Sequence, residues 1–215
     1  MRPTILLSAL LLTGVSPNSQ ADAPGGIEAL EQRLARTPPV STDFVEYRFS
    51  HLLKKPLRSG GTLEYRADGA LVRNVTTPHR ETTTVLGDQL RIARAGKPER
   101  TLSLQRAPQL RVLLGSFRAL LEGQLTPLQQ DFDVTLDENG AHWTLRLTPK
   151  DASLAKHLAR IEVHGNGDRP GCMKAIEPDG DGAFTLFGAA PDAAAPLPTR
   201  AELEIRCRTS GSAGP

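Results

Sequence analysis

Apolar and polar side chains alternate along most of this chain in short runs. Val45–Phe49, Leu63–Tyr65 and Trp143–Leu147 are clear examples. A period of two is typical of a β-strand with one buried face. Turn residues such as Asn139-Gly140 separate the runs, and the spacers are too short for crossover helices. The pattern therefore predicts about ten short strands in an antiparallel sheet, the last of them over 203–207.

Three segments have helical periodicity instead. Apolar side chains recur every three or four residues in 26–36 and, as a longer stripe, in 108–121, and a shorter helical stretch covers 152–158. Because a one-faced sheet must cover its apolar side, we expect these helices to pack on a curled sheet. The pattern is compatible with two kinds of interior: a fully packed core, or a concave apolar space suited to an apolar ligand.

The first 23 residues have the pattern of a secretory signal. Arg2 precedes an apolar stretch, Ile5–Val15, and Ala21-Asp22-Ala23 fits a cleavage site. The stretch is too short to span a bilayer, although a retained interfacial anchor would also fit it. We therefore expect a signal peptide over 1–23, a single exported domain over 24–209 in the periplasm, and a flexible tail over 210–215.

Cys172 and Cys207 are the only cysteines. In an exported protein an even number suggests one disulfide. Two free buried thiols are the alternative. A metal site would need further histidine or cysteine ligands, which the sequence does not place near this pair.

Charge and composition narrow the classes of partner. The chain carries 26 basic and 24 acidic side chains, and only 4% of its residues are aromatic, so nothing argues for nucleic acid as a partner. One stretch is locally basic, with Arg91, Arg94, Lys97, Arg100 and Arg106. It fits a solvated strand face or, alternatively, a surface that docks to an acidic partner or an anionic lipid surface.

The sequence contains none of the common enzyme motifs: no G-x-S-x-G, P-loop, G-x-G-x-x-G or H-E-x-x-H. A lipid or glycan hydrolase would need a nucleophile, a base and an orienting group, which no motif supplies. Asp179–Gly182 lacks the further ligands of a calcium loop and predicts a tight turn. We therefore expect no catalytic residues, no cofactor and no metal.

A set of scattered positions matches the pattern of a known family. In the first strands these are Phe44, Pro56, Leu57, Ser59, Gly61, Leu63, Tyr65, Leu71, Pro78, Gly87 and Leu90, and later Phe132, Trp143, Leu145, Leu147, Pro149 and the helix over 108–121. Over 27–190 the chain resembles the periplasmic outer-membrane lipoprotein carriers, the LolA-like family. It is most similar to a divergent branch associated with polyene and glycolipid biosynthesis clusters.

The resemblance implies an α+β fold, an unclosed antiparallel half-barrel of about ten strands covered on its concave face by two or three helices. It also implies a monomer whose cavity carries acyl chains from an inner-membrane donor complex to an outer-membrane acceptor. A carrier is needed because an acyl chain is unstable in water: the transfer of each methylene out of water is favourable by about 0.8 kcal/mol of free energy.

In this family an arginine latches the helical lid. Arg66 is the nearest match and Arg73 a second candidate, while an ordinary surface arginine is the alternative for both. The proline that usually follows the latch arginine is replaced by Ala67-Asp68, which puts the same latch in doubt.

Together these observations predict a periplasmic carrier, not an enzyme, that binds the acyl or other apolar part of a lipoprotein or lipid-like cargo. The side chains expected to line its cavity are Val45, Tyr47, Phe49, Leu63, Tyr65, Leu90, Ile92, Leu113, Phe117, Leu120, Trp143 and Leu145. The alternative is an envelope sensor or assembly module that uses the same fold to bind a protein partner.

Overall fold

The computed structural model describes residues 26–106 and 108–210, without the side chains of 108–110, 113 and 117. The predicted signal peptide over 1–23 and the tail beyond 210 lie outside the described residues. None of the helices in the described part of the chain is long and apolar enough to span a bilayer.

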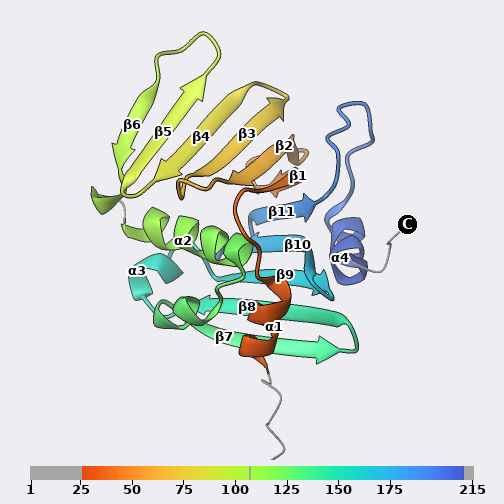
Figure 1. Ribbon diagram of the computed structural model, residues 1–215. Helices are drawn as coiled ribbons and strands as arrows, with labels where there is room; N and C mark the ends of the chain where they lie inside the picture. Colours follow the sequence, from red (N-terminus) through yellow and green to blue (C-terminus); the bar gives the residue numbers. More distant parts are fainter. Residues whose placement is uncertain (1–25, 107, 211–215) are drawn as a thin grey trace, which may run out of the picture.

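Eleven strands form one antiparallel sheet in the described residues (Figure 1). The strands are β1 Val40–Phe49, β2 Leu57–Tyr65, β3 Leu71–Thr77, β4 Glu81–Leu86, β5 Gln89–Arg94, β6 Arg100–Ser103, β7 Phe132–Asn139, β8 His142–Pro149, β9 Arg160–Asn166, β10 Arg169–Ile176 and β11 Gly182–Phe187. The helices are α1 Ile27–Leu34, α2 Pro108–Glu122, α3 Ala152–Ala155 and α4 Arg200–Thr209, with short 3-10 helices η1 Leu104–Arg106 and η2 Thr126–Gln130.

The strand order is β6-β5-β4-β3-β2-β1-β11-β10-β9-β8-β7. The chain runs outward from β1 to β6, crosses back through α2, and returns from β7 to β11, which pairs with β1. The end strands β6 and β7 do not pair with each other, so the sheet stays open. The predicted α+β half-barrel is confirmed, and so is the β7–β8 hairpin, whose turn uses Gly140 at φ 62°.

Helices α1 and α2 lie on one face of the sheet, here called the concave face (Figure 1). The main apolar core forms between them and strands β7 to β10. Its fully buried members include Leu30 of α1, Phe132 of β7, Leu145 of β8 and Val163 of β9. Burial of side chains from both layers stabilises the contact between helix and sheet.

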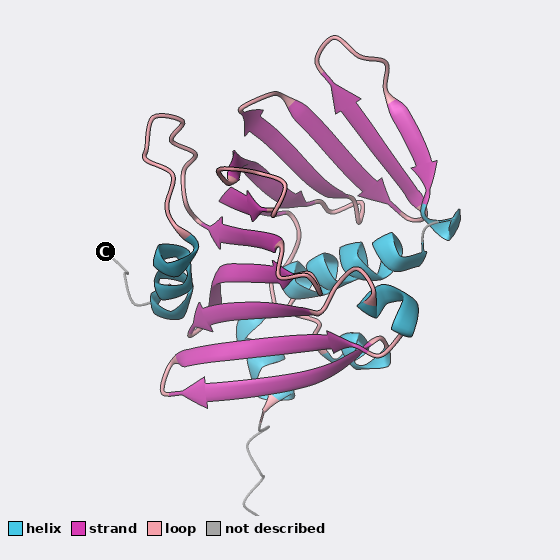
Figure 2. Cartoon of the chain, turned by 180° about the vertical axis from the view of Figure 1, so that it is seen from behind, coloured by secondary structure: helices cyan, strands magenta, loops and turns pink. Residues whose placement is uncertain are grey.

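Helix α4 lies on the opposite, convex face, as the view from behind shows (Figure 2). Neighbouring residues of β10 demonstrate the two faces: Met173 joins the core under α1 and α2, whereas Cys172 packs with Leu203 of α4. Central strands are therefore covered on both sides, and only part of the sheet has a single buried face.

The strand predicted over 203–207 was wrong, because these residues form α4. Leu203 and Cys207 are four residues apart and therefore share one helix face, where both are fully buried. Thr199 and Glu202 form a capping box that starts the helix. Alternating apolar residues over five positions do not distinguish a strand from a helix, whereas the capping pair Thr199 and Glu202 favours a helix.

Candidate functional site

A small apolar recess lies between α2 and the middle of the sheet. Its apolar lining consists of Phe44, Leu63, Leu71, Val85, Leu114 and Leu121, with Glu46, Arg73, Thr83 and Thr185 at its margins. Its volume is about 80 Å³. The recess is thus bounded by strands β1 to β4 and β11 on one side and by α2 on the other.

A larger cavity, here called the mouth, adjoins the recess. It has a volume of about 720 Å³ and is lined by parts of α1, α2, β1, β2 and the β9–β10 turn. Leu63 and Leu121 line both spaces, so the recess lies directly behind the mouth. The volume of the mouth lies in the range of ordinary ligand pockets.

Two charged groups face each other across the mouth. Arg36, in the segment between α1 and β1, lies 2.6 Å from the carboxylate of Asp168 in the β9–β10 turn and also donates to its carbonyl oxygen. Both side chains are more than a third exposed, so this pair contributes little to stability. It gives the mouth a polar margin around an apolar interior.

Strand pairing places the side chains of the recess on one face. Phe44 of β1 is opposite Gly61 of β2, which is opposite Val75 of β3. A Cβ atom at Gly61 would lie 1.9 Å from the carbonyl oxygen of Asn74, so this position requires glycine. The ring of Phe44 forms part of the lining of the recess.

Arg73 lies in the sheet at the margin of the recess. Its guanidinium is 4.8 Å from the centroid of the Phe44 ring, and it donates to Glu46 and Ser59, each at 3.1 Å. All of these partners belong to β1 and β2. Arg66, the other predicted latch residue, is paired with Glu64 at 3.2 Å.

Among the described side chains, a polar contact between α2 and the sheet is made by an arginine of the helix. Arg118 of α2 donates to the hydroxyl oxygen of Tyr65 at 3.0 Å and pairs with Glu122 at 2.8 Å. A hydrogen bond to Glu122 and burial raise the pKa of Tyr65 above its usual value, while the charge of Arg118 lowers it. The hydroxyl therefore stays protonated at neutral pH and accepts the bond from the helix. Arg118 was not among the predicted latch residues, since nothing in the sequence distinguishes it from an arginine on a solvated helix face.

The predicted cavity residues divide between the two faces. Leu63 lines both spaces, Leu120 lines the mouth, and Tyr65 lies under Arg118. Leu90 and Ile92 of β5 are paired with Val85 and Thr83, and so lie on the same concave face. Trp143 and Leu145 belong to the main core beside the mouth. The side chains of Leu113 and Phe117 are not among those that the structure describes.

Three of the residues predicted to line the cavity lie elsewhere: Val45, Tyr47 and Phe49. They lie on the convex face with Phe184 and the residues of α4. Apolar side chains of β1 point to both of its faces because both faces are covered. The sequence alone therefore does not show that the face with Val45, Tyr47 and Phe49 packs against α4 and not against the cavity. Phe44, one residue earlier, is the β1 side chain that faces the recess.

The predicted disulfide is present and joins β10 to α4. Cys172 and Cys207 are both fully buried and are 35 residues apart in sequence. The loop that this bond closes contains β11 and the segment 188–199. The bond therefore ties α4 to the convex face.

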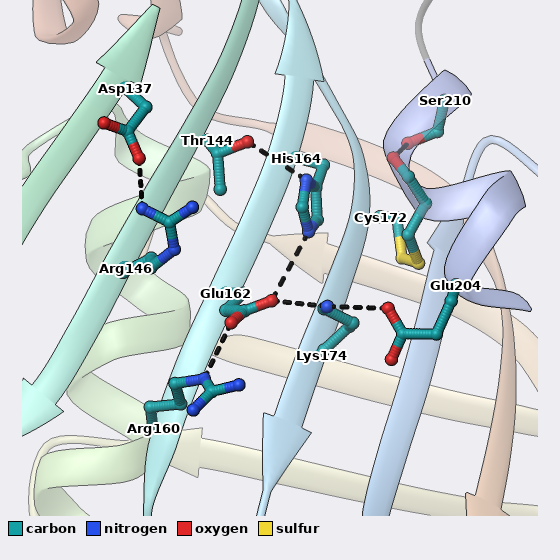
Figure 3. Close-up of polar contacts among 11 residues, drawn as sticks. Asp137, Thr144, Arg146, Arg160, Glu162, His164, Cys172, Lys174, Glu204 and Ser210 are labelled. Carbon is teal, nitrogen blue, oxygen red and sulfur yellow. Dashed lines mark hydrogen bonds and ion pairs between the residues drawn. A yellow bond between two sulfur atoms is a disulfide. The ribbon is translucent and has the colours of Figure 1, made fainter. Parts of the chain in front are cut away.

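Beside the disulfide lies a group of titratable side chains, here called the convex charge cluster: the buried Glu162, His164 and Lys174 and the half-buried Glu204 (Figure 3). The ammonium of Lys174 pairs with Glu162 and lies 2.9 Å from Glu204 of α4. Burial acts to raise the pKa of Glu162, but hydrogen bonds and charge from Lys174 and Arg160 outweigh it and lower that pKa. Burial, aided by the charge of Lys174, lowers the pKa of His164.

A family model decides the identity of the chain. The model described as "Outer membrane lipoprotein carrier protein LolA-like" matches residues 20–210. The chain belongs to this LolA-like family. None of the curated proteins is similar enough to this LolA-like chain to match it.

Solved structures similar to this LolA-like chain include the LolA superfamily protein NE2245 from Nitrosomonas europaea, with 10% identity and a TM-score of 0.39 over 79% of this chain and 95% of that one. LprF from Mycobacterium bovis is 11% identical, with a TM-score of 0.34 over 81% of this chain and 92% of that one. MucB, in the MucA/MucB complex of Pseudomonas aeruginosa, is 16% identical, with a TM-score of 0.38 over 82% of this chain and 60% of that one.

Proposed function

We propose that this LolA-like protein is a periplasmic carrier that binds the acyl or other apolar part of a lipoprotein or lipid-like cargo. The observation that carries the proposal is the pair of adjoining spaces beneath α2, an open mouth that leads to an apolar recess. An acyl chain that leaves the inner membrane for the outer membrane must be shielded from water in this way.

The small volume of the recess indicates how loading would proceed. At about 80 Å³ it lies far below the range of ordinary ligand pockets. A long acyl chain would therefore enter only as α2 moves away from the sheet. The bond from Arg118 to Tyr65 would hold the helix in the closed position, so we assign the latch to this pair and not to Arg66 or Arg73.

The proposal is tested with protein purified from the periplasm under native conditions. Mass spectrometry of the intact protein and of its organic extract should reveal a lipid or acylated peptide bound one to one. The delipidated protein should then bind a fluorescent fatty acid saturably. Absence of both signals, together with a stoichiometric protein partner in a pull-down, would replace the carrier by a protein-binding module.

A further inference from the structure

Three connections lie at the same end of the sheet: those between β1 and β2, β3 and β4, and β5 and β6. The pairing of β1 to β6 as successive antiparallel neighbours places them in one row, with the β5–β6 hairpin at the top of Figure 1. We call residues 50–57, 78–81 and 94–100 the basic rim. This part of the sheet extends beyond α2 in both views.

The β1–β2 loop exposes an unusual amount of apolar surface. Leu52 is 81% exposed, Leu57 56% and Leu53 39%. Three of the seven large apolar side chains that are exposed in the described part of the chain therefore lie in this one loop or at the first residue of β2. Scattered exposed leucines need no explanation, but a cluster of exposed leucines in one short segment indicates a contact surface.

The loop is held in a defined orientation. The amide of His51 donates to the Asp181 carboxylate at 2.8 Å, and the His51 Nδ1 atom lies 3.0 Å from its other oxygen. The amide of Leu53 donates to the carbonyl oxygen of Ser50 at 2.9 Å. The loop is thus tied to the β10–β11 turn at its base, and its leucines are presented outward.

Two lysines, Lys54 and Lys55, directly follow Leu52 and Leu53, and further basic side chains lie along the same row of connections. The basic rim contains Lys54, Lys55, Arg80, Arg94, Lys97 and Arg100, against two acidic residues, Glu81 and Glu99. Arg94 is paired with Glu81, whereas Lys54, Lys55, Arg80 and Lys97 have no ion pair among the described residues. The neighbouring β10–β11 turn carries three acidic side chains: Glu177 is paired with Arg48, while Asp181 and Asp179 face His51 at 3.0 Å and 3.8 Å.

From this arrangement we propose that the basic rim docks on an anionic lipid bilayer, with Leu52 and Leu53 inserted at the level of the headgroups. Exposed leucines beside unpaired lysines match the two attractions that hold peripheral proteins on such membranes, apolar insertion and attraction to lipid phosphates. A protein interface would more often centre on tryptophan, tyrosine or arginine in a pocket. The β1–β2 loop, where the exposed leucines lie, contains no tryptophan, tyrosine or arginine.

The test measures binding of the full mature chain to sedimented vesicles. We expect it to bind vesicles of equal parts phosphatidylglycerol and phosphatidylcholine, and to bind pure phosphatidylcholine far more weakly. Each lysine near an anionic surface contributes about fivefold in affinity, so Lys54→Ala/Lys55→Ala should weaken binding about tenfold or more. The matched control, Lys156→Ala/Arg208→Ala, removes two exposed charges elsewhere and should bind like the unchanged protein.

Insertion is tested separately from charge. Leu52→Trp should show a blue shift of its fluorescence when anionic vesicles are added, whereas Ile205→Trp, at an exposed position of α4, should show none. Binding that is equal for both lipid mixtures, or unaffected by the lysine substitutions, would overturn the proposal. So would a Leu52→Trp spectrum that vesicles leave unchanged.

These readouts do not depend on the cavity. If the protein binds no acyl chain but still sediments with anionic vesicles, the carrier proposal fails and the rim proposal stands. If it binds acyl chains but no vesicles, the reverse holds.

Discussion

Arg118 on α2 donates a hydrogen bond of 3.0 Å to the hydroxyl of Tyr65 on β2, and its guanidinium lies 5.4 Å from the centroid of the same ring. This is a direct polar tie between the helix that covers the recess and the strand that forms its wall. Glu122, one turn further along α2, orients the arginine. The arginine is thus on the helix and its acceptor on the strand, whereas the resemblance points to Arg66 or Arg73, outside the helix.

Removal of this acceptor should loosen α2. Tyr65→Phe deletes the hydroxyl and keeps the ring, so we expect a loss of about 0.5–1.5 kcal/mol in the free energy that holds the helix closed. Amide hydrogen exchange in α2 should become several times faster, and fatty-acid exchange with it. Tyr47→Phe, on the convex face, is the control and should change neither rate. Unchanged exchange in the Tyr65→Phe variant would show that the tie does not hold the helix.

The disulfide should contribute strongly to stability. The bond between Cys172 and Cys207 closes a loop of 35 residues, and chain entropy predicts a stabilisation of about 3–4 kcal/mol for such a loop. Denaturant unfolding with and without a reducing agent measures this difference. Because α4 is the element that the bond holds, its amides should lose protection first on reduction. Equal unfolding midpoints in the two conditions would contradict this role.

Acidification should destabilise the protein through the convex charge cluster. The pKa of His164 is lowered from 6.5 by burial and by Lys174, so its neutral form stabilises the fold above pH 6.5. That contribution is lost as the pH falls through the lowered pKa. The pKa of Glu162 is lowered from 4.5, and its contribution is lost at still lower pH. Protonation of either group therefore lowers the stability of the fold as the pH falls.

The sign of this effect can be checked with His164→Asn. Stability followed by chemical denaturation should fall less steeply below pH 6.5 in this variant than in the unchanged protein. His142→Asn, at an exposed position of β8, should keep the original slope. If all three proteins share one pH profile, the buried histidine does not contribute as described.

Alternation along the chain was enough to predict the sheet, since period-two runs and the Asn139-Gly140 turn fix the strands and hairpins locally. The alternation does not show which side chains of β1 face the recess, because Phe44 and Val45 are both apolar and lie on opposite covered faces. Which of the two alternating sets of side chains faces the recess depends on where α4 packs. That position depends on contacts between segments far apart in the sequence.

The latch shows a second limit of the sequence. Arg66 and Arg73 lie near a family position, but Arg66 pairs with Glu64 of β2, and Arg73 of β3 pairs with Glu46 of β1, two strands away. Arg118 was overlooked because an exposed helical arginine four residues before a glutamate is typical of a solvated helix face. Only the packing of α2 over β2 brings it to Tyr65.

The central claim, that apolar cargo occupies the recess under α2, is tested most directly by two substitutions in β4. Thr83 lines the recess, while Thr84 points to the opposite face of the same strand, and both are half-buried. A fluorescent fatty acid should bind Thr83→Trp about tenfold more weakly, since an indole fills the space that several methylenes would occupy. Thr84→Trp should bind like the unchanged protein. Equal affinity of the two variants would contradict the assignment of the cargo to this recess.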